Sequence, residues 1–402
     1  MTSDIAERPY DLVLFGATGF TGGLTADYLA AHASAGIRWA LAGRNPAKLD
    51  AVRARLAGID PRWADLDLLP VDSSDLASLA RVAAAARVVI TTVGPYLEYG
   101  GPLVAACAAA GTDYVDLTGE PEFIDRMYLE HHQTASRTGA RIVHACGFDS
   151  IPHDLGALYT VQQLPAGASL TVRGVARTNA AFSGGTVHSA LGQLSRLPAM
   201  QRTASARKRI EPKPRGRRSR VKTGMPRRDR VTGTWLIPLP TIDPQIVARS
   251  GLARPDYGPD FTYTHYAGAK HATTVVGAIV GFLTALIAVQ IPPLRHAIGK
   301  RMPQGDGPSQ ERRDRTWFTV DFIGAGGGQT VHTQVRGGDP GYSETAKMLA
   351  EAALCLAFDD NPPTAGQVTT ATAMGENLTR RLIDAGISFS VIASTPDTTK
   401  GE

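Results

Sequence analysis

Hydrophobic residues in the first 150 positions are grouped in short runs that alternate with longer amphipathic stretches. Six runs rich in β-forming residues span 10–15, 37–44, 66–72, 87–94, 112–119 and 140–147. Stretches compatible with helices follow the first five runs, at 20–33, 45–56, 77–86, 101–111 and 121–139. Strands that alternate with helices at this spacing predict an α/β fold with a parallel, doubly wound sheet.

The pattern changes after Gly147. We expect strands at 169–178, 234–242 and 261–268, a hairpin at 316–338, and helices at 187–200 and 343–358. The chain has 402 residues, more than one hydrophobic core usually serves. We therefore predict a first domain over 1–150, a second α+β domain with a mainly antiparallel sheet over 151–340, and C-terminal helices in 341–402 that pack back on the first domain.

A glycine-spaced turn, GATGFTG, follows the first predicted strand. Glycines let the backbone approach a pyrophosphate, whose charge is stabilised by the N-terminus of the next helix. The position of this turn between a strand and a helix favours a Rossmann-type dinucleotide site over a turn that only packs. The residues expected to contact the cofactor here are Gly16, Thr18, Gly19, Phe20, Thr21 and Gly22.

The end of the second strand indicates which dinucleotide is bound. It reads Gly43-Arg44-Asn45, with Lys48 close behind and without the acidic residue that would bind the ribose 2′-hydroxyl of NAD. A guanidinium and an ammonium group suit the 2′-phosphate of NADP. We therefore predict an NADP-dependent oxidoreductase, and the alternative is that Arg44 is a surface charge without a ligand.

Ligands of doubly wound sheets lie across the carboxyl ends of the strands. The loop after the fourth strand, Val93-Gly94-Pro95, is therefore expected to approach the pyrophosphate or the nicotinamide ribose. Gly119 after the fifth strand, and Asp149 and Ser150 after the sixth, are expected to border the nicotinamide. For Asp149 and Ser150 the alternative is a capping role at the helix that begins at Ile151.

Several blocks of sequence together resemble one protein family. They are GATGFTG, LAGRN followed by KL, TVGPY, DLTGE, GFDSIPHDLG and GYSETAKMLAEAAL, and they extend from Asp11 to about Gly386. The chain resembles the saccharopine dehydrogenase-like oxidoreductases, in particular their actinobacterial branch of trans-acting enoyl reductases. The resemblance implies a Rossmann domain with a substrate domain, and reduction of a polyketide-derived acyl chain during the assembly of envelope glycolipids.

Reduction of an enoyl thioester requires a group that stabilises the enolate and a proton for the α-carbon. Tyr96 is our first candidate donor because its loop is expected to face the cofactor, and its alternative role is packing. His153 and Asp149, at the start of a predicted helix, are further candidates. We expect no metal, because no His, Cys or Asp cluster has the spacing of metal ligands, and no nucleophilic Ser or Cys motif is present.

Three functions agree with these features. The first is an NADP-dependent reductase of an enoyl or keto group on a carrier-bound or lipid-linked acyl substrate. The second is a saccharopine-type amino- or imino-acid dehydrogenase, and the third is a non-catalytic, NADP-binding scaffold at a membrane. A long apolar segment, described below, favours the first, because an amino-acid pocket does not need it. The sequence leaves open whether the protein forms a homodimer.

The net charge of +5 arises from one segment. Residues 202–230 contain 13 Lys and Arg against two acidic residues, so this segment carries +11 and the rest of the chain −6. Interleaved Pro and Gly predict a loop. Such a loop could bind an acidic carrier protein, attract anionic lipid head groups, or have no partner. Nucleic acid is not expected, because no stacking aromatic residues accompany the charge.

Residues 272–294 contain no charged side chain. The length would allow a membrane span, which needs ~20 apolar residues, but threonines, a glutamine and two prolines lower the hydropathy. We expect a helix that lines an acyl pocket, with contact to a membrane surface or a true span as alternatives. Three isolated cysteines and the absence of a signal sequence indicate a cytoplasmic protein, with a position at the inner face of the plasma membrane left open.

Overall fold

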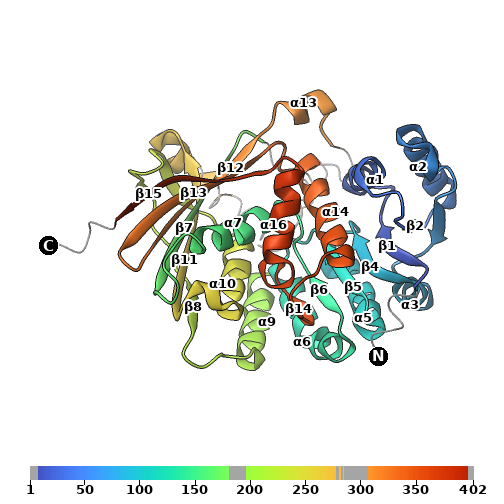
Figure 1. Cartoon of the computed structure of the whole chain (residues 1–402), viewed down its shortest axis with the longest axis horizontal. Coiled ribbons are helices and arrows are strands. Elements are labelled where there is room, and N and C mark those ends of the chain that lie inside the picture. The colour runs from blue at the N-terminus through green and yellow to red at the C-terminus, as the bar shows by residue number, and fades with distance from the viewer. Residues whose placement is uncertain (1–7, 181–195, 278–279, 282–283, 285–306, 397–402) are drawn as a thin grey trace.

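A computed structural model of the chain describes residues 8–180, 196–277, 280, 281, 284 and 307–396. Two β-sheets flanked by helices lie beside each other in it, and the red C-terminal helices stand between them (Figure 1). One core cluster includes both Leu12 of the first sheet and Phe322 of the second. The two domains therefore share buried packing and hold each other in place.

The first sheet has seven parallel strands in the order β14-β6-β5-β4-β1-β2-β3. They are β1 (Tyr10–Phe15), β2 (Trp39–Gly43), β3 (Asp67–Pro70), β4 (Ala86–Thr91), β5 (Asp113–Asp116), β6 (Arg141–Val143) and β14 (Gly366–Val368). This order confirms the predicted doubly wound sheet. It also adds β14, a short strand near the C-terminus that the apolar pattern did not indicate.

Helices cover both faces of this sheet, because successive side chains of a strand point to opposite faces. Leu12 and Leu14 of β1 belong to the core cluster that also contains residues of helices α1, α2 and α14, whereas Val13 and Phe15 pack with residues of α3, α5 and α6. These helices, with the short α4, are α1 (Phe20–His32), α2 (Pro46–Ile59), α3 (Leu76–Ala85), α4 (Tyr96–Tyr99), α5 (Gly101–Ala110), α6 (Pro121–Thr138) and α14 (Ser343–Phe358).

The second sheet has eight strands, seven of them in the order β15-β13-β12-β7-β11-β10-β9, while β8 pairs with β11. They are β7 (Leu170–Thr178), β8 (Arg218–Val221), β9 (Arg227–Arg228), β10 (Trp235–Pro238), β11 (Asp260–Ala269), β12 (Phe318–Gly326), β13 (Gln329–Gly337) and β15 (Ser388–Pro396). Among the strands that the structure describes here, only the β7–β11 and β8–β11 pairs are parallel. The predicted mainly antiparallel sheet is confirmed, and β12 and β13 form the expected hairpin.

Further helices lie along the chain either between the two sheets or between strands of the second sheet. They are α7 (Ile151–Val161), α9 (Leu197–Ile210), α10 (Asp243–Ala253), α13 (Gln310–Asp314), α15 (Thr370–Ala373) and α16 (Gly375–Asp384). α14 contacts α1 and β4 of the first domain, whereas β15 pairs with β13 and extends the second sheet.

The basic segment is not a loop throughout, which corrects the sequence-based expectation for 202–230. Its first part belongs to α9, and the guanidinium of Arg207 is buried there. Arg207 donates to Asp125 of α6 and to Glu211, and lies 4.0 Å over the ring of Tyr128. These ion pairs hold part of the segment against the first domain. The charged side chains of Lys213, Arg215 and others further along remain exposed.

Most of the apolar segment 272–294 lies outside the described residues, so the expected acyl-pocket helix is not described over its full length. In the part that is described, residues 272–277 are helical, Val275 is buried and Val276 is exposed. Among the helices of the described residues, none is long and apolar enough to cross a bilayer.

Candidate active site

The glycine turn between β1 and α1 leaves room for a phosphate against the backbone. Gly16 has φ +101°, and a Cβ at this position would lie 2.6 Å from Oγ1 of Thr92. A Cβ at Gly22 would lie 2.1 Å from the carbonyl oxygen of Gly16. Thr18 and Gly19 are exposed, and Phe20 and Thr21 are half-buried. The turn fits the pyrophosphate of a dinucleotide, because only glycine allows this close approach of strand, turn and helix.

The residues that we expect to bind the 2′-phosphate of NADP follow the end of β2. Arg44, Asn45 and Lys48 are all exposed. Asn45 caps α2, since its Oδ1 accepts a hydrogen bond from the backbone N–H of Lys48 at 3.1 Å. Arg44 and Lys48 therefore offer their charged groups to solvent at the carboxyl end of the sheet, where NADP would present its phosphate.

The loop after β4 is fixed between the ends of β1 and β5. The hydroxyl of Thr92 donates to the carbonyl of Gly16 at 3.2 Å. The carboxylate of Glu120 accepts hydrogen bonds from the backbone N–H groups of Tyr96 at 3.2 Å and Leu97 at 2.8 Å. Gly94 stays exposed between these anchors. The loop Val93-Gly94-Pro95 thus presents a fixed backbone beside the glycine turn.

Asp116, at the end of β5, holds the next two loops together. Its Oδ1 accepts from the N–H groups of Thr118 and Ala145, both at 3.0 Å. Its Oδ2 accepts from the hydroxyl of Tyr114 at 2.9 Å and lies 2.7 Å from Nδ1 of His144. The loops that follow β5 and β6 are therefore positioned by one buried carboxylate.

Asp149 lies against Gly119, so the loops that follow β5 and β6 meet at this point. A Cβ at Gly119 would be 3.1 Å from Oδ2 of Asp149. The backbone around Asp149 is strained, since Ala145 and Ser150 have φ +60° and +108°, at a cost of about 1–3 kcal/mol each. Such strain persists only where the surrounding structure enforces it, and it is common at functional sites.

The capping alternative is not seen for Ser150. It occupies the N-cap position of α7, but its side chain makes no capping hydrogen bond. Its hydroxyl instead donates to Oδ1 of Asp243, at 3.4 Å. Ser150 thus joins the loop after β6 to the first residue of α10.

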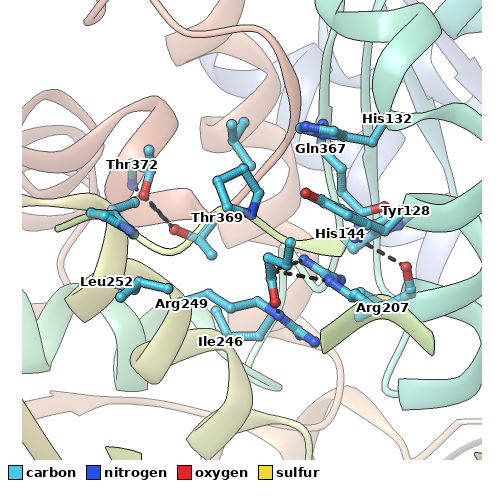
Figure 2. Close-up of a pocket in the computed structure, with 16 residues that line it drawn as sticks. Tyr128, His132, His144, Arg207, Ile246, Arg249, Leu252, Gln367, Thr369 and Thr372 are labelled. Carbon is cyan, nitrogen blue, oxygen red and sulfur yellow. Dashed lines mark hydrogen bonds and ion pairs between the residues drawn. The ribbon is translucent and has the colours of Figure 1, made fainter. Parts of the chain in front are cut away.

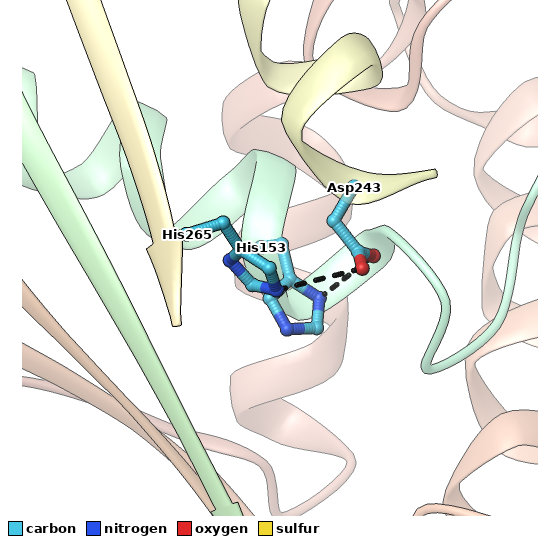
Figure 3. A group of neighbouring side chains, drawn as sticks. All are labelled: His153, Asp243 and His265. Carbon is cyan, nitrogen blue, oxygen red and sulfur yellow. Dashed lines mark ion pairs between the residues drawn. The ribbon is translucent and has the colours of Figure 1, made fainter. Parts of the chain in front are cut away.

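Three buried side chains from three elements form a polar cluster next to Asp149 (Figure 3). His153 lies in the first turn of α7, Asp243 begins α10, and His265 is on β11. Nδ1 of His153 is 3.2 Å from Oδ1 of Asp243, and Nε2 of His265 is 3.6 Å from Oδ2 of the same carboxylate. The fold brings together a carboxylate and two imidazoles that are far apart in the sequence.

Burial and mutual charge set the protonation of this group. Burial lowers the pKa of His153, but the carboxylates of Asp243 and Asp149 outweigh it and the pKa is raised. Burial opposes ionisation of Asp243, yet the two histidines lower its pKa overall. Burial and the charge of His153 lower the pKa of His265 to about 3. Loss of hydration and the nearby Asp243 raise the pKa of Asp149 to about 6.

Tyr96, our first candidate donor, occupies a different environment. The residue is 7% exposed, and its hydroxyl donates to the carbonyl of Thr91 at 3.1 Å. The same oxygen accepts from the N–H of Leu117 at 3.2 Å. These contacts match the packing alternative, because the phenol connects the loops after β4 and β5 instead of facing an open site.

A cavity of about 200 Å³ lies further along α10 (Figure 2). Asp243 is at the start of this helix, and Ile246, Arg249 and Leu252 on later turns line the cavity. Arg249 pairs with Asp125, and Val368 of β14 also lines the cavity. The remaining walls combine apolar side chains with polar and charged ones, among them Ile124, Tyr128, His132, His144, Arg207, Glu211 and Gln367. Sequence reasoning did not indicate this cavity, because α6, α9, α10 and β14 all contribute to it.

The glycine turn, the basic group after β2 and the mixed-sheet second domain define a dinucleotide-dependent oxidoreductase. Residues 12–143 match the family model described as the saccharopine dehydrogenase NADP binding domain. The chain is 39% identical, over 95% of its length and 97% of the other, to a Mycobacterium tuberculosis protein named as a trans-acting enoyl reductase. It is 36% identical to the trans-acting enoyl reductase of Mycobacterium ulcerans, over 96% of this chain and 98% of that one.

The chain therefore belongs to the family of the trans-acting enoyl reductases, and it is an NADP-dependent oxidoreductase, as predicted. The solved structure of apo saccharopine dehydrogenase (L-Glu forming) from Saccharomyces cerevisiae has a TM-score of 0.57, with 14% identity over 95% of this chain and 99% of that one. At this identity the likeness concerns the fold alone, which is the predicted Rossmann domain with a second sheet domain.

Proposed function

We propose that this protein reduces the carbon–carbon double bond of an enoyl thioester with NADPH. The observation that carries the proposal is the carboxyl group of Asp149 lying against Gly119, beside the buried cluster of His153 and Asp243. This point lies at the carboxyl ends of β5 and β6, where a doubly wound sheet places the reacting end of a bound dinucleotide. Bound NADPH would supply the hydride to the β-carbon.

The chain must then supply the proton that the α-carbon receives. We assign that proton to the carboxyl group of Asp149, whose pKa of about 6 gives it a larger share of the neutral, donating form than an ordinary aspartate has. The charge of His153, in the first turn of α7, lowers the pKa of this carboxyl and so limits the rise that burial and Asp243 cause. Tyr96 holds the neighbouring loops in place through its two backbone hydrogen bonds.

We propose that the acyl chain extends along α10 into the cavity lined by Ile246 and Leu252. The support is the position of Asp243 on the same helix, because one helix then borders both the reacting centre and an apolar space.

The resemblance to trans-acting enzymes extends this proposal to the form of the substrate. We propose a polyketide-derived acyl chain on a carrier protein, used for envelope glycolipids, and an enzyme that works at the cytoplasmic face of the membrane. The exposed basic residues after α9, such as Lys213 and Arg215, support this proposal, since they offer positive charge to an acidic carrier or to anionic lipids.

The test is NADPH oxidation with purified protein and a panel of substrates. Enoyl thioesters of increasing chain length should be reduced, with one NADPH oxidised per saturated thioester formed. Oxidation only with 2-oxoglutarate plus lysine would overturn the proposal in favour of an amino-acid dehydrogenase. Saturable NADPH binding without turnover of any substrate would identify a scaffold instead.

A further inference from the structure

The contacts of His153 and His265 with Asp243 differ from the other two histidine–aspartate contacts in the described residues, those of His144 and His332. His144 and His332 lie 2.7 and 2.9 Å from Asp116 and Asp321, which are ordinary hydrogen-bond distances. The two contacts to Asp243 measure 3.2 and 3.6 Å, and Nδ1 of His153 and Nε2 of His265 have no hydrogen-bond partner. Both nitrogens approach the carboxylate without directing an N–H at it.

These separations match two ligand atoms on one metal ion. Imidazole nitrogens and carboxylate oxygens bind Zn²⁺ at 2.0–2.2 Å, so two tetrahedral ligands lie about 3.3 Å apart. All three ligand atoms of His153, Asp243 and His265 fall within 4.8 Å of one another. An ion between them would also provide the partner that two fully buried nitrogens lack, which is otherwise costly.

The surroundings hold the three side chains in a ligating arrangement. The hydroxyl of Tyr263 lies 3.1 Å from Nδ1 of His265, which leaves Nε2 of this ring for the cluster. Thr241 and Ser150 donate hydroxyl hydrogen bonds to the two oxygens of Asp243. Metal-binding histidines and carboxylates are commonly fixed by such outer hydrogen bonds.

We propose that His153, Asp243 and His265 bind a divalent transition-metal ion, with Zn²⁺ as the best match for two imidazoles and one carboxylate. Three protein ligands leave a fourth position, which is typical of a metal that contacts substrate or water. The absence of metal spacing in the sequence does not conflict with this site, because the ligands come from α7, α10 and β11. Metal binding goes beyond the proposed enoyl reduction and does not depend on it.

The test measures metal binding without any substrate. Protein freed of any affinity tag is stripped with a chelator, and Zn²⁺ is titrated against a chromophoric chelator. The expected result is one tightly bound equivalent per chain, and Co²⁺ in its place should show the visible absorption of a tetrahedral site. Lack of saturable Zn²⁺ binding by the folded wild-type chain would overturn the proposal, whatever the outcome of the enoyl reductase assay.

Variants locate the ion. His265→Gln and Asp243→Asn should lose the bound equivalent, and Tyr263→Phe should weaken binding by about 10–100-fold. His332→Gln is the matched control, because this histidine also contacts a carboxylate but lies outside the cluster. Circular dichroism confirms that each variant is folded. Equal Zn²⁺ affinity in wild-type and folded His265→Gln protein would place the ion elsewhere and refute the assignment.

Discussion

The carbonyl oxygen of Gly16 lies 2.1 Å from the position that a Cβ at residue 22 would occupy. Gly22 lies in the first turn of α1, so this close approach places the N-terminus of α1 next to the end of β1. Because the obstacle is backbone and not a flexible side chain, a larger residue at position 22 must displace the helix. The N–H groups that would face a pyrophosphate then move with it.

We therefore expect Gly22→Ala to weaken NADPH binding by at least about tenfold, equivalent to ~1.4 kcal/mol. Fluorescence titration of NADPH measures this effect. Gly36→Ala is the control, because a Cβ at Gly36 has no neighbour within 4 Å. Unchanged NADPH affinity in Gly22→Ala would show that the turn does not bind the cofactor.

Arg44→Ala tests how the enzyme selects NADP. Loss of a charge-assisted hydrogen bond to the 2′-phosphate costs about 1.5–3 kcal/mol, so affinity for NADPH should fall roughly 10–100-fold. Affinity for NADH should change little, because NADH has no phosphate at this position. Arg81→Ala, at an exposed position on α3, serves as the control. An equal loss for both dinucleotides would contradict the role of Arg44.

Asp149→Asn removes the carboxyl group that we assign as proton donor. We expect kcat for enoyl thioesters to fall by about 10²–10⁴-fold, the range for loss of a positioned general acid. NADPH affinity should stay close to that of the wild type, because the change keeps the shape of the side chain. Asp384→Asn, an exposed position on α16, is the control. Wild-type turnover in Asp149→Asn would transfer the proton-donor role to another group.

Tyr96→Phe distinguishes the packing role of this residue from a catalytic one. Removal of the hydroxyl leaves the N–H of Leu117 without its partner, so the free energy of unfolding should decrease by about 1–3 kcal/mol. Turnover should remain within a fewfold of the wild-type value, since the hydroxyl faces backbone groups. Denaturant unfolding and steady-state kinetics measure the two effects. A large loss of kcat with unchanged stability would restore Tyr96 as the donor.

The elements of the first domain could be predicted in detail because the residues that specify each of them are neighbours in the sequence. Most of its strands are short apolar runs, and α2 begins at the capping residue Asn45. Gly16 lies in the turn after β1, and Gly22 lies in the first turn of α1. The cofactor site follows from these neighbours in sequence. β14 was missed because its three residues resemble a loop and become a strand only through pairing with β6.

The reacting centre could be predicted only in part. Asp149 and His153 belong to one sequence block, so their proximity was foreseeable. Asp243 and His265 reach them only because α10 packs against both α7 and β11, a long-range arrangement that no spacing encodes. Arg207 shows the same limit, since a basic run looks solvated until Asp125 of another helix provides a partner. Tertiary contacts therefore determine which charged side chains are buried and paired, and the sequence pattern alone does not show this.

Leu252→Trp tests whether the acyl chain enters the cavity along α10. Leu252 is half-buried at the cavity wall, so an indole can fill much of the space of about 200 Å³ with little disturbance of the core. Short thioesters should be reduced at the wild-type rate, because the reacting centre near Asp243 lies at the other end of the helix. Longer thioesters should lose about tenfold in kcat/KM, since each methylene excluded from an apolar pocket costs ~0.8 kcal/mol. Leu76→Trp, an exposed leucine on α3, provides the control. If Leu252→Trp lowers kcat/KM equally for short and long thioesters, the chain does not occupy this cavity.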